Sequence, residues 1–151
     1  MTLDAQTVTS LGKVGGILAL SLSAIGSGLG IGAAGMAAVG AWKKCYAQNK
    51  LAPFILAVFV GAPITQTFYG MIVMLKLINL ATNGAPFLPL IGWGLMGGIA
   101  IGLSALIQGR IAACASDAQG ETGQGFTNYL MAFGIIESVA IFVMVFILIA
   151  A

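Results

Sequence analysis

TGQGFTNYLMAFGIIESVAIFVMVFILIAA, residues 122–151, is a largely apolar stretch that contains one charged side chain, Glu137. A helix needs about 20 residues to cross a bilayer core of roughly 30 Å, so this stretch is long enough to span a membrane. Glu137 lies about ten residues after Thr127, which puts it roughly 15 Å deep at a rise of about 1.5 Å per residue. The sequence therefore predicts a carboxylate near the middle of the membrane.

Three more uncharged stretches fill most of the remaining chain: 14–42, 51–75 and 77–109. The chain is 60% hydrophobic and 7% charged, whereas about a quarter of the residues in soluble domains carry a charge. We therefore predict an all-α membrane protein with four transmembrane helices in one membrane domain, 1–151. The connections that this leaves, near 43–50, 81–86 and 117–123, are too short for a soluble catalytic domain.

The charges predict the orientation. The connection 43–50 carries three lysines and the next connection carries none, and cytoplasmic loops are enriched in Lys and Arg, so we expect both termini outside. Cys45 and Cys114 then lie toward the reducing cytoplasm, and the chain has no His. We expect neither a structural disulfide nor a zinc site. The polar leading segment 1–10 carries Asp4 where a secretory signal would be basic, so we expect it to be retained.

The chain reads as two tandem hairpins, 11–80 and 87–151, related by a shift of about 70 residues, as expected of an internal duplication. The first and third helices are rich in small residues, which let helix backbones approach closely: Gly26, Gly28, Gly30 and Gly32, then Gly94, Gly98 and Gly102. The second and fourth carry bulky side chains suited to lipid or an outer layer: Phe54, Phe59, Phe68, Met71 and Met74, then Phe126, Phe133, Phe142 and Phe146. This alternation favours a ring of identical copies with the glycine-rich helices inside. The alternative is ordinary packing within one bundle.

Polar side chains gather at the depth of Glu137. The repeat puts Gln66 at the position that corresponds to Glu137, and Gln108 reaches a similar depth in the third helix. Thr65 and Gln66 follow Pro63, which frees a backbone carbonyl. A carboxylate, two amides, a hydroxyl and a carbonyl form an all-oxygen set that suits a hard cation. We favour Na⁺ over a proton, because a proton needs only the acid and one acceptor.

Simpler interpretations remain for each group. Glu137 would be a protonated residue that locks two helices together, and Gln66 and Gln108 would be interhelical hydrogen-bonding residues. A non-rotary four-helix channel or transporter and a purely structural membrane protein are the competing functions. An enzyme is not expected, because the chain has no His, no nucleophile–base pair and no GK[ST] phosphate loop. Nor is a nucleic-acid partner expected.

Four segments carry a resemblance to a known family: GSGLGIGAAGMAAVG (26–40), PITQTFYG (63–70), LIQGRIAA (106–113) and FGIIESVAIF (133–142). Over essentially its full length the chain resembles the proteolipid ring proteins of V-type ATPases and ATP synthases, the K and c subunits. The resemblance implies a multi-pass rotor ring in a bacterial plasma membrane. The ring would turn against a static membrane subunit that supplies an Arg, with central-stalk subunits at the cytoplasmic loops and lipid around it.

The resemblance also implies an ion site. In the sodium-translocating bacterial members the ligands are a Leu carbonyl, a Thr and a Gln of the second helix, a Gln of the third helix and the Glu of the fourth. The matching positions are the backbone carbonyl of Ala62 and the side chains of Thr65, Gln66, Gln108 and Glu137. Ala stands in place of Leu, which matters little for a backbone carbonyl. The same rotor carrying H⁺ is the alternative.

Overall fold

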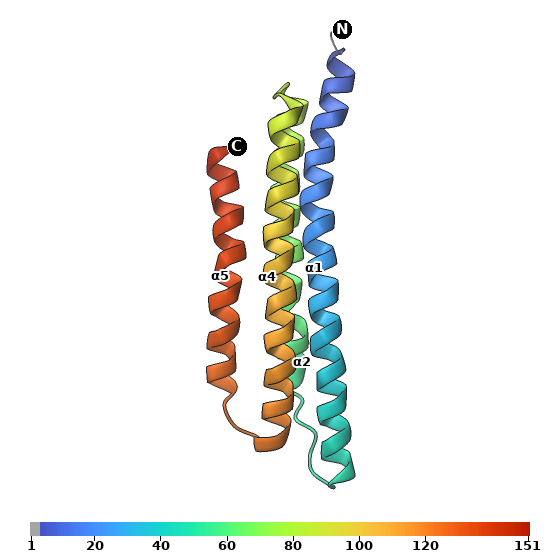
Figure 1. Ribbon diagram of the computed structural model, residues 1–151, viewed down its shortest axis with the longest axis vertical. Coiled ribbons are helices and arrows are strands. Elements are labelled where there is room, and N and C mark those ends of the chain that lie inside the picture. The colour runs from blue at the N-terminus through green and yellow to red at the C-terminus, as the bar shows by residue number, and fades with distance from the viewer. Residues whose placement is uncertain (1–3) are drawn as a thin grey trace.

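A computed structural model describes residues 4–151, and within that range every regular element is helical. The elements are α1 (Ala5–Ala47), α2 (Leu56–Gly61), the short 3₁₀ helix η1 (Ala62–Ile64), α3 (Thr65–Thr82), α4 (Phe87–Thr122) and α5 (Phe126–Ala150). α2, η1 and α3 run on as a single span, so the chain has four helical spans long and apolar enough to cross a membrane (Figure 1). The predicted all-α class and the four spans are confirmed.

α1 extends beyond the uncharged stretch 14–42 at both ends. α1 begins at Ala5, because the Asp4 carboxylate caps it by accepting a 2.8 Å hydrogen bond from the Thr7 backbone N–H. That bond, with a second from the Thr7 hydroxyl, holds the pKa of Asp4 below its usual range. The first three residues of the predicted leading segment 1–10 lie outside the described residues, and residues 5–10 belong to α1.

The predicted connections at the lysine-rich end are partly helical, which corrects the sequence interpretation. Lys44 still belongs to α1, and α4 continues through the expected loop 117–123 to Thr122. Lys44 Nζ lies 2.6 Å from Glu121 and 3.4 Å from Asp117, two acids one turn apart on α4. These exposed ion pairs favour the last turn of α4, which ends where Gly123 adopts a left-handed φ of 67°.

α1 and α4 pack backbone to backbone. A side chain at Gly26 would collide with the backbone of Gly102, and one at Gly94 with the backbone of Gly15. Not every glycine of the first helix serves this contact, since Gly28 and Gly32 have open space around them within the chain. The glycine pattern had two interpretations, a ring of identical copies or ordinary packing within one bundle. Packing within one bundle accounts for Gly26 but not for Gly28 and Gly32.

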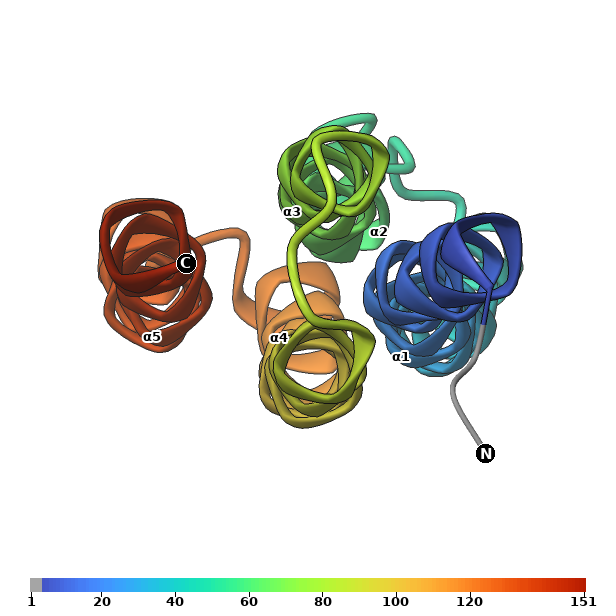
Figure 2. The same cartoon turned by 90° about the horizontal axis from the view of Figure 1, so that it is seen from above.

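The other two spans lie on one side of this pair. Seen from above, α3 covers the seam between α1 and α4, and α5 lies beside α4, away from α1 (Figure 2). α5 has the smallest buried share of the four spans, and only Phe133, Ala140 and Ile147 are buried in it. Because these three are spaced seven residues apart, α5 touches the bundle along one narrow stripe.

Two aromatic side chains assigned to lipid or an outer layer lie inside instead. Phe59 is fully buried and Phe133 nearly so. Their ring centres are 5.2 Å apart in an edge-to-face contact, and Phe59 also stacks on Phe126 at 5.6 Å. Edge-to-face rings attract, so the aromatic residues fill the gap between α2 and α5. Phe142 and Phe146 remain exposed, as predicted.

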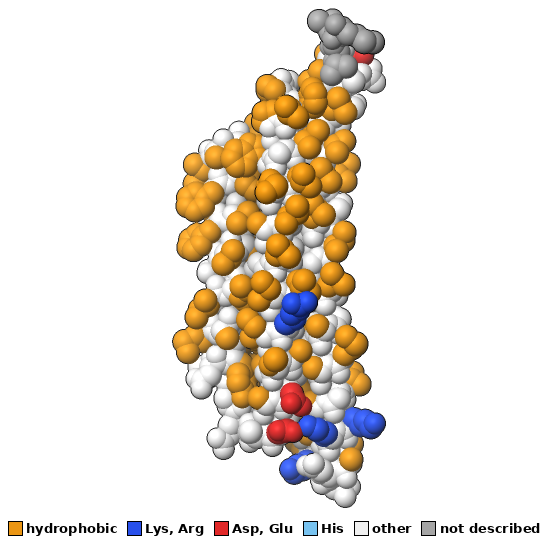
Figure 3. Space-filling view, in the orientation of Figure 1, with side chains coloured by type: hydrophobic (Ala, Val, Ile, Leu, Met, Phe, Trp, Pro, Cys, Tyr) orange, Lys and Arg blue, Asp and Glu red, His pale blue; other side chains and the backbone are white. Residues whose placement is uncertain are grey.

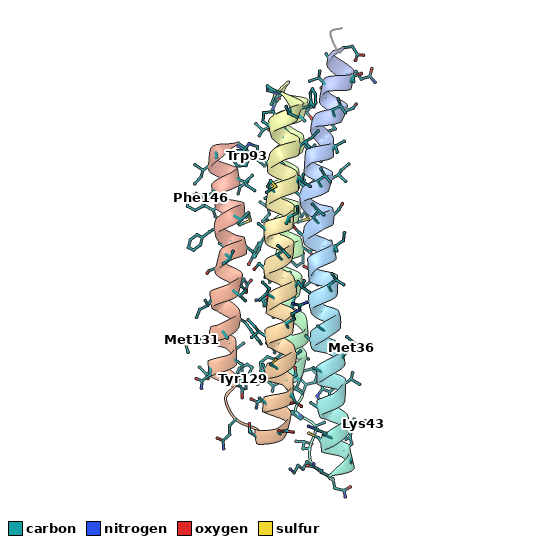
Figure 4. All side chains as sticks on the ribbon, in the orientation of Figure 1. Met36, Lys43, Trp93, Tyr129, Met131 and Phe146 are labelled. Atoms are coloured by element: carbon teal, nitrogen blue, oxygen red, sulfur yellow. The ribbon has the colours of Figure 1, made fainter. Side chains whose placement is uncertain are left out.

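The surface is apolar along most of its length. Hydrophobic side chains cover the upper and middle parts of the face in Figure 3, and most charged groups gather at the lower end. Figure 4 shows Lys43 there, on the last turns of α1, with Trp93 and Phe146 near the opposite end. This distribution is that of a multi-pass membrane protein.

The glycine contact yields a prediction. Gly94→Ala adds a methyl group where the Gly15 backbone lies, so we expect a loss of about 1–3 kcal/mol of unfolding free energy. Gly92→Ala, two residues earlier on the same helix, enters open space and serves as the control. Unfolding of the purified protein by sodium dodecyl sulfate, followed by circular dichroism, measures the difference. Equal stability of the two variants would contradict the contact.

Candidate ion-binding site

A break in the second span positions the first site groups. Pro63 has no backbone N–H, so it cannot make the helical hydrogen bond at its position, and Ala62–Ile64 form a 3₁₀ turn between α2 and α3. The Ala62 carbonyl accepts a 3.2 Å hydrogen bond from the Thr65 hydroxyl. The turn brings the Ala62 carbonyl and the Thr65 hydroxyl together. The carbonyl that Pro63 itself deprives of a helical donor lies four residues earlier, at Phe59.

Two glutamines link α3 to α4. Gln66 and Gln108 are both fully buried, and the Gln66 amide donates a 3.0 Å hydrogen bond to Gln108 Oε1. The Gln66 Oε1 atom lies 3.1 Å from the Thr65 hydroxyl, whose one hydrogen is shared between this oxygen and the Ala62 carbonyl. Buried amides are costly to leave unpaired, so this chain of bonds satisfies the polar groups that the site brings into the apolar interior.

Glu137 closes the network from α5. Its Oε1 atom accepts a 2.7 Å hydrogen bond from the Tyr69 hydroxyl, and its Oε2 atom accepts one of 3.4 Å from the Gln108 amide. The Gln108 amide also donates to the Phe133 carbonyl at 3.2 Å, one turn before Glu137. Glu137 is half-buried. The carboxylate thus lies at the side of the bundle, between α3, α4 and α5.

The five predicted groups, Ala62, Thr65, Gln66, Gln108 and Glu137, therefore belong to a single hydrogen-bonded network. Helical rise gave the depth of Gln108 and Glu137, the internal repeat gave Gln66, and the family resemblance gave Ala62. Residues at equal depth on neighbouring helices can meet when those helices pack side by side. Whether they bind an ion is a separate question.

Sequence reasoning missed two groups. Tyr69 follows Thr65 by one helical turn, within the quoted segment 63–70, and that spacing was the signal available for it. Ser104 precedes Gln108 by one turn on α4, and its hydroxyl donates a 2.8 Å hydrogen bond to the Ile136 carbonyl. Which side of each helix faces α5 could not be read from the sequence.

The chemistry of the network is that of an oxygen site with one negative charge. Within residues 4–151 no cluster of three or more His, Cys, Asp or Glu side chains is present, and no Lys or Arg lies within ion-pair distance of Glu137. One univalent cation or one proton would make the site neutral. Carboxylate, amide, hydroxyl and carbonyl oxygens are ligands for hard cations rather than soft transition metals.

Comparison with known proteins adds to this geometry. Residues 91–150 match the family of the ATP synthase C subunit. The match covers nearly all of α4 and all of α5, and it includes Gln108 and Glu137. Subunit K of the A-type ATP synthase of Methanocaldococcus jannaschii is 33% identical over 132 residues, which are 87% of this chain and 57% of that protein. The chain thus spans little more than half the length of this relative.

The Tyr69 contact yields a prediction. Tyr69→Phe removes one of the two hydrogen-bond donors to Glu137. Because a hydrogen bond to a charged group contributes about 1.5–3 kcal/mol, we expect Glu137 in this variant to react about ten- to a hundredfold faster with a carbodiimide. Mass spectrometry of the modified peptide measures the rate. Tyr129→Phe is the control, since the Tyr129 hydroxyl makes no hydrogen bond within residues 4–151. Wild-type reactivity of Tyr69→Phe would contradict the role of this contact.

Proposed function

We propose that the chain is a rotor subunit of an A/V-type ATP synthase or ATPase and carries one cation, Na⁺, on Glu137. The observation that carries the proposal is the hydrogen-bonded network in which Gln108 links the carboxylate of Glu137 to Gln66, Thr65 and the Ala62 carbonyl. The match of residues 91–150 to the family of the ATP synthase C subunit supports the rotor role. So does the likeness to an archaeal subunit K.

The number of oxygen groups favours Na⁺ over a proton. Both Glu137 oxygens accept hydrogen bonds, from Tyr69 and from Gln108. A protonated carboxyl group would need only one acceptor for its own hydrogen, and the Tyr69 hydroxyl oxygen, 2.7 Å from Glu137 Oε1, could be that acceptor. A bare cation instead needs several oxygens in place of its water shell, and the Ala62 carbonyl, Thr65 and Gln66 supply oxygens beyond those a proton requires.

The position of Glu137 fits a carrier that passes through lipid. A bound cation neutralises the carboxylate, so a loaded rotor copy faces hydrocarbon at low cost, whereas an ionised carboxylate at the bilayer centre costs several kcal/mol. Release therefore requires a partner of opposite charge. We propose an Arg on a static membrane subunit, because within residues 4–151 no basic side chain pairs with Glu137. That pairing would keep an unloaded site from re-entering lipid and would thereby bias rotation.

Assembly follows from the same proposal. Identical copies form a ring, with the α1–α4 pair on its inner side and the lysine-rich end in the cytoplasm, where the central-stalk subunits bind. Both termini are outside. The duplicated hairpins 11–80 and 87–151 then leave one titratable site per chain.

Moving one univalent ion through 100 mV supplies about 2.3 kcal/mol, so several copies must act for each ATP, whose chemistry belongs to partner subunits.

A non-rotary channel is less well supported. A water-filled pore needs polar side chains along the length of a helix face, whereas the buried polar groups around Glu137 lie at one depth and bond to one another. In a structural protein the two hydrogen bonds to Glu137 would serve only to hold α5 against α3 and α4, and the match to the family of the ATP synthase C subunit would have no explanation. The carrier interpretation uses all of these contacts.

Carbodiimide labelling with and without Na⁺ tests the proposal. We expect Na⁺ to slow modification of Glu137 in the wild-type protein. Gln66→Ile removes one ligand, and we expect it to raise the Na⁺ concentration for half-protection by about tenfold or more. Gln119→Ile is the matched control, because Gln119 is also buried but lies outside the network. Labelling that is equally fast at every Na⁺ concentration would rule out sodium, and labelling equally fast at every pH as well would rule out a cation site.

A further inference from the structure

The position of α5 along the axis of α4 must be fixed by specific contacts if Glu137 is to reach its partners. Apolar contacts along the stripe of Phe133, Ala140 and Ile147 hold α5 near the bundle. Such contacts are non-directional, so they resist separation of the helices more than sliding along the axis. A slide by one residue would move Glu137 by about 1.5 Å. Its contact with Gln108 is already 3.4 Å long, so it would not survive the slide.

Ser104 supplies a directional contact at this level. Its side chain is 3% exposed, and its hydroxyl donates a 2.8 Å hydrogen bond to the carbonyl of Ile136, the residue before Glu137. The bond lies one turn along α4 from the Gln108 bond to the Phe133 carbonyl. α4 thus holds the α5 backbone at two successive points beside the acid.

The bond is unusual among the serine hydroxyls of residues 4–151. Those of Ser21, Ser23 and Ser138 bond to carbonyls three or four residues earlier on their own helix, as serines in apolar helices commonly do. Within the described chain, Ser104 alone among the serines bonds across to another helix. In hydrocarbon such a bond has no competition from water.

We propose that Ser104 is a positioning residue for the ion site: it fixes the height of α5 so that Glu137 meets Gln108 and Tyr69 together. The role is indirect, since Ser104 contacts the backbone beside Glu137 and not its carboxylate. The proposal rests on the proposed function, in which Glu137 holds the cation. It adds a residue that controls cation affinity without being a ligand.

Ser104→Ala tests the role, because it removes the hydroxyl and leaves the small side chain that close packing needs. In the purified protein we expect the Na⁺ concentration that half-protects Glu137 from carbodiimide to rise by about threefold, the effect of losing one interhelical hydrogen bond in a membrane. We expect amide hydrogen exchange over residues 134–140 to quicken as well. Ser104→Thr, which keeps a hydroxyl, should restore both values toward wild type.

Ser138→Ala is the matched control: it removes a hydroxyl next to Glu137 whose bond stays within α5, and both values should remain at wild type. Ser104→Ala with wild-type protection and wild-type exchange would overturn the proposal, as would an equal effect of Ser138→Ala. If Na⁺ does not protect the wild-type protein, the sodium assignment fails. Hydrogen exchange, which needs no cation, then decides on Ser104.

Discussion

A carboxylate in hydrocarbon is the constraint on which the rest of this structure depends. Ionised and unpaired, Glu137 would cost about 2.5–3.5 kcal/mol even on insertion scales, which give the lower values. The chain lowers that cost with two donors, one on each carboxylate oxygen. The donors are side chains of two other helices, and they are effective only if those helices keep their places. The packing of the bundle therefore keeps the two donors of Glu137 in position.

Each helix contributes to positioning the groups around Glu137. The glycine contacts bring α1 and α4 together and give α4 a fixed support, and α4 carries Gln108 and Ser104. The 3₁₀ turn after Gly61 sets the start of α3, which carries Thr65, Gln66 and Tyr69. α5, by contrast, is thinly packed. That suits the proposed function, in which the acid meets lipid, a static subunit and a cation in turn, but it leaves the position of α5 dependent on a few polar contacts.

The sequence predicted well at which depth the site groups lie, but it predicted poorly which side chains face a neighbouring helix. Helical rise converts residue number into depth for Gln108 and Glu137, and the internal repeat places Gln66 at the position of Glu137. All three could therefore be expected at one level before any packing was known. The side of a helix that faces a neighbour depends on how all the helices pack. Sequence reasoning therefore assigns Phe59 to lipid or an outer layer and overlooks Tyr69. In the structure Phe59 is buried and Tyr69 contacts the Glu137 carboxylate. Ser104 gave no signal at all, because a serine in an apolar helix usually bonds to its own backbone.

In the proposed function, Glu137 and its oxygen neighbours hold one sodium ion per chain. Equilibrium binding of radioactive sodium to the purified protein measures this occupancy without any other component of the complex, with the wild type and Glu137→Gln compared at equal helical content. We predict saturable binding of about one ion per chain for the wild type, and its loss in the variant, which keeps the size of the side chain but not its charge. Binding that Glu137→Gln retains, or a wild-type protein that binds no sodium, would contradict the sodium site.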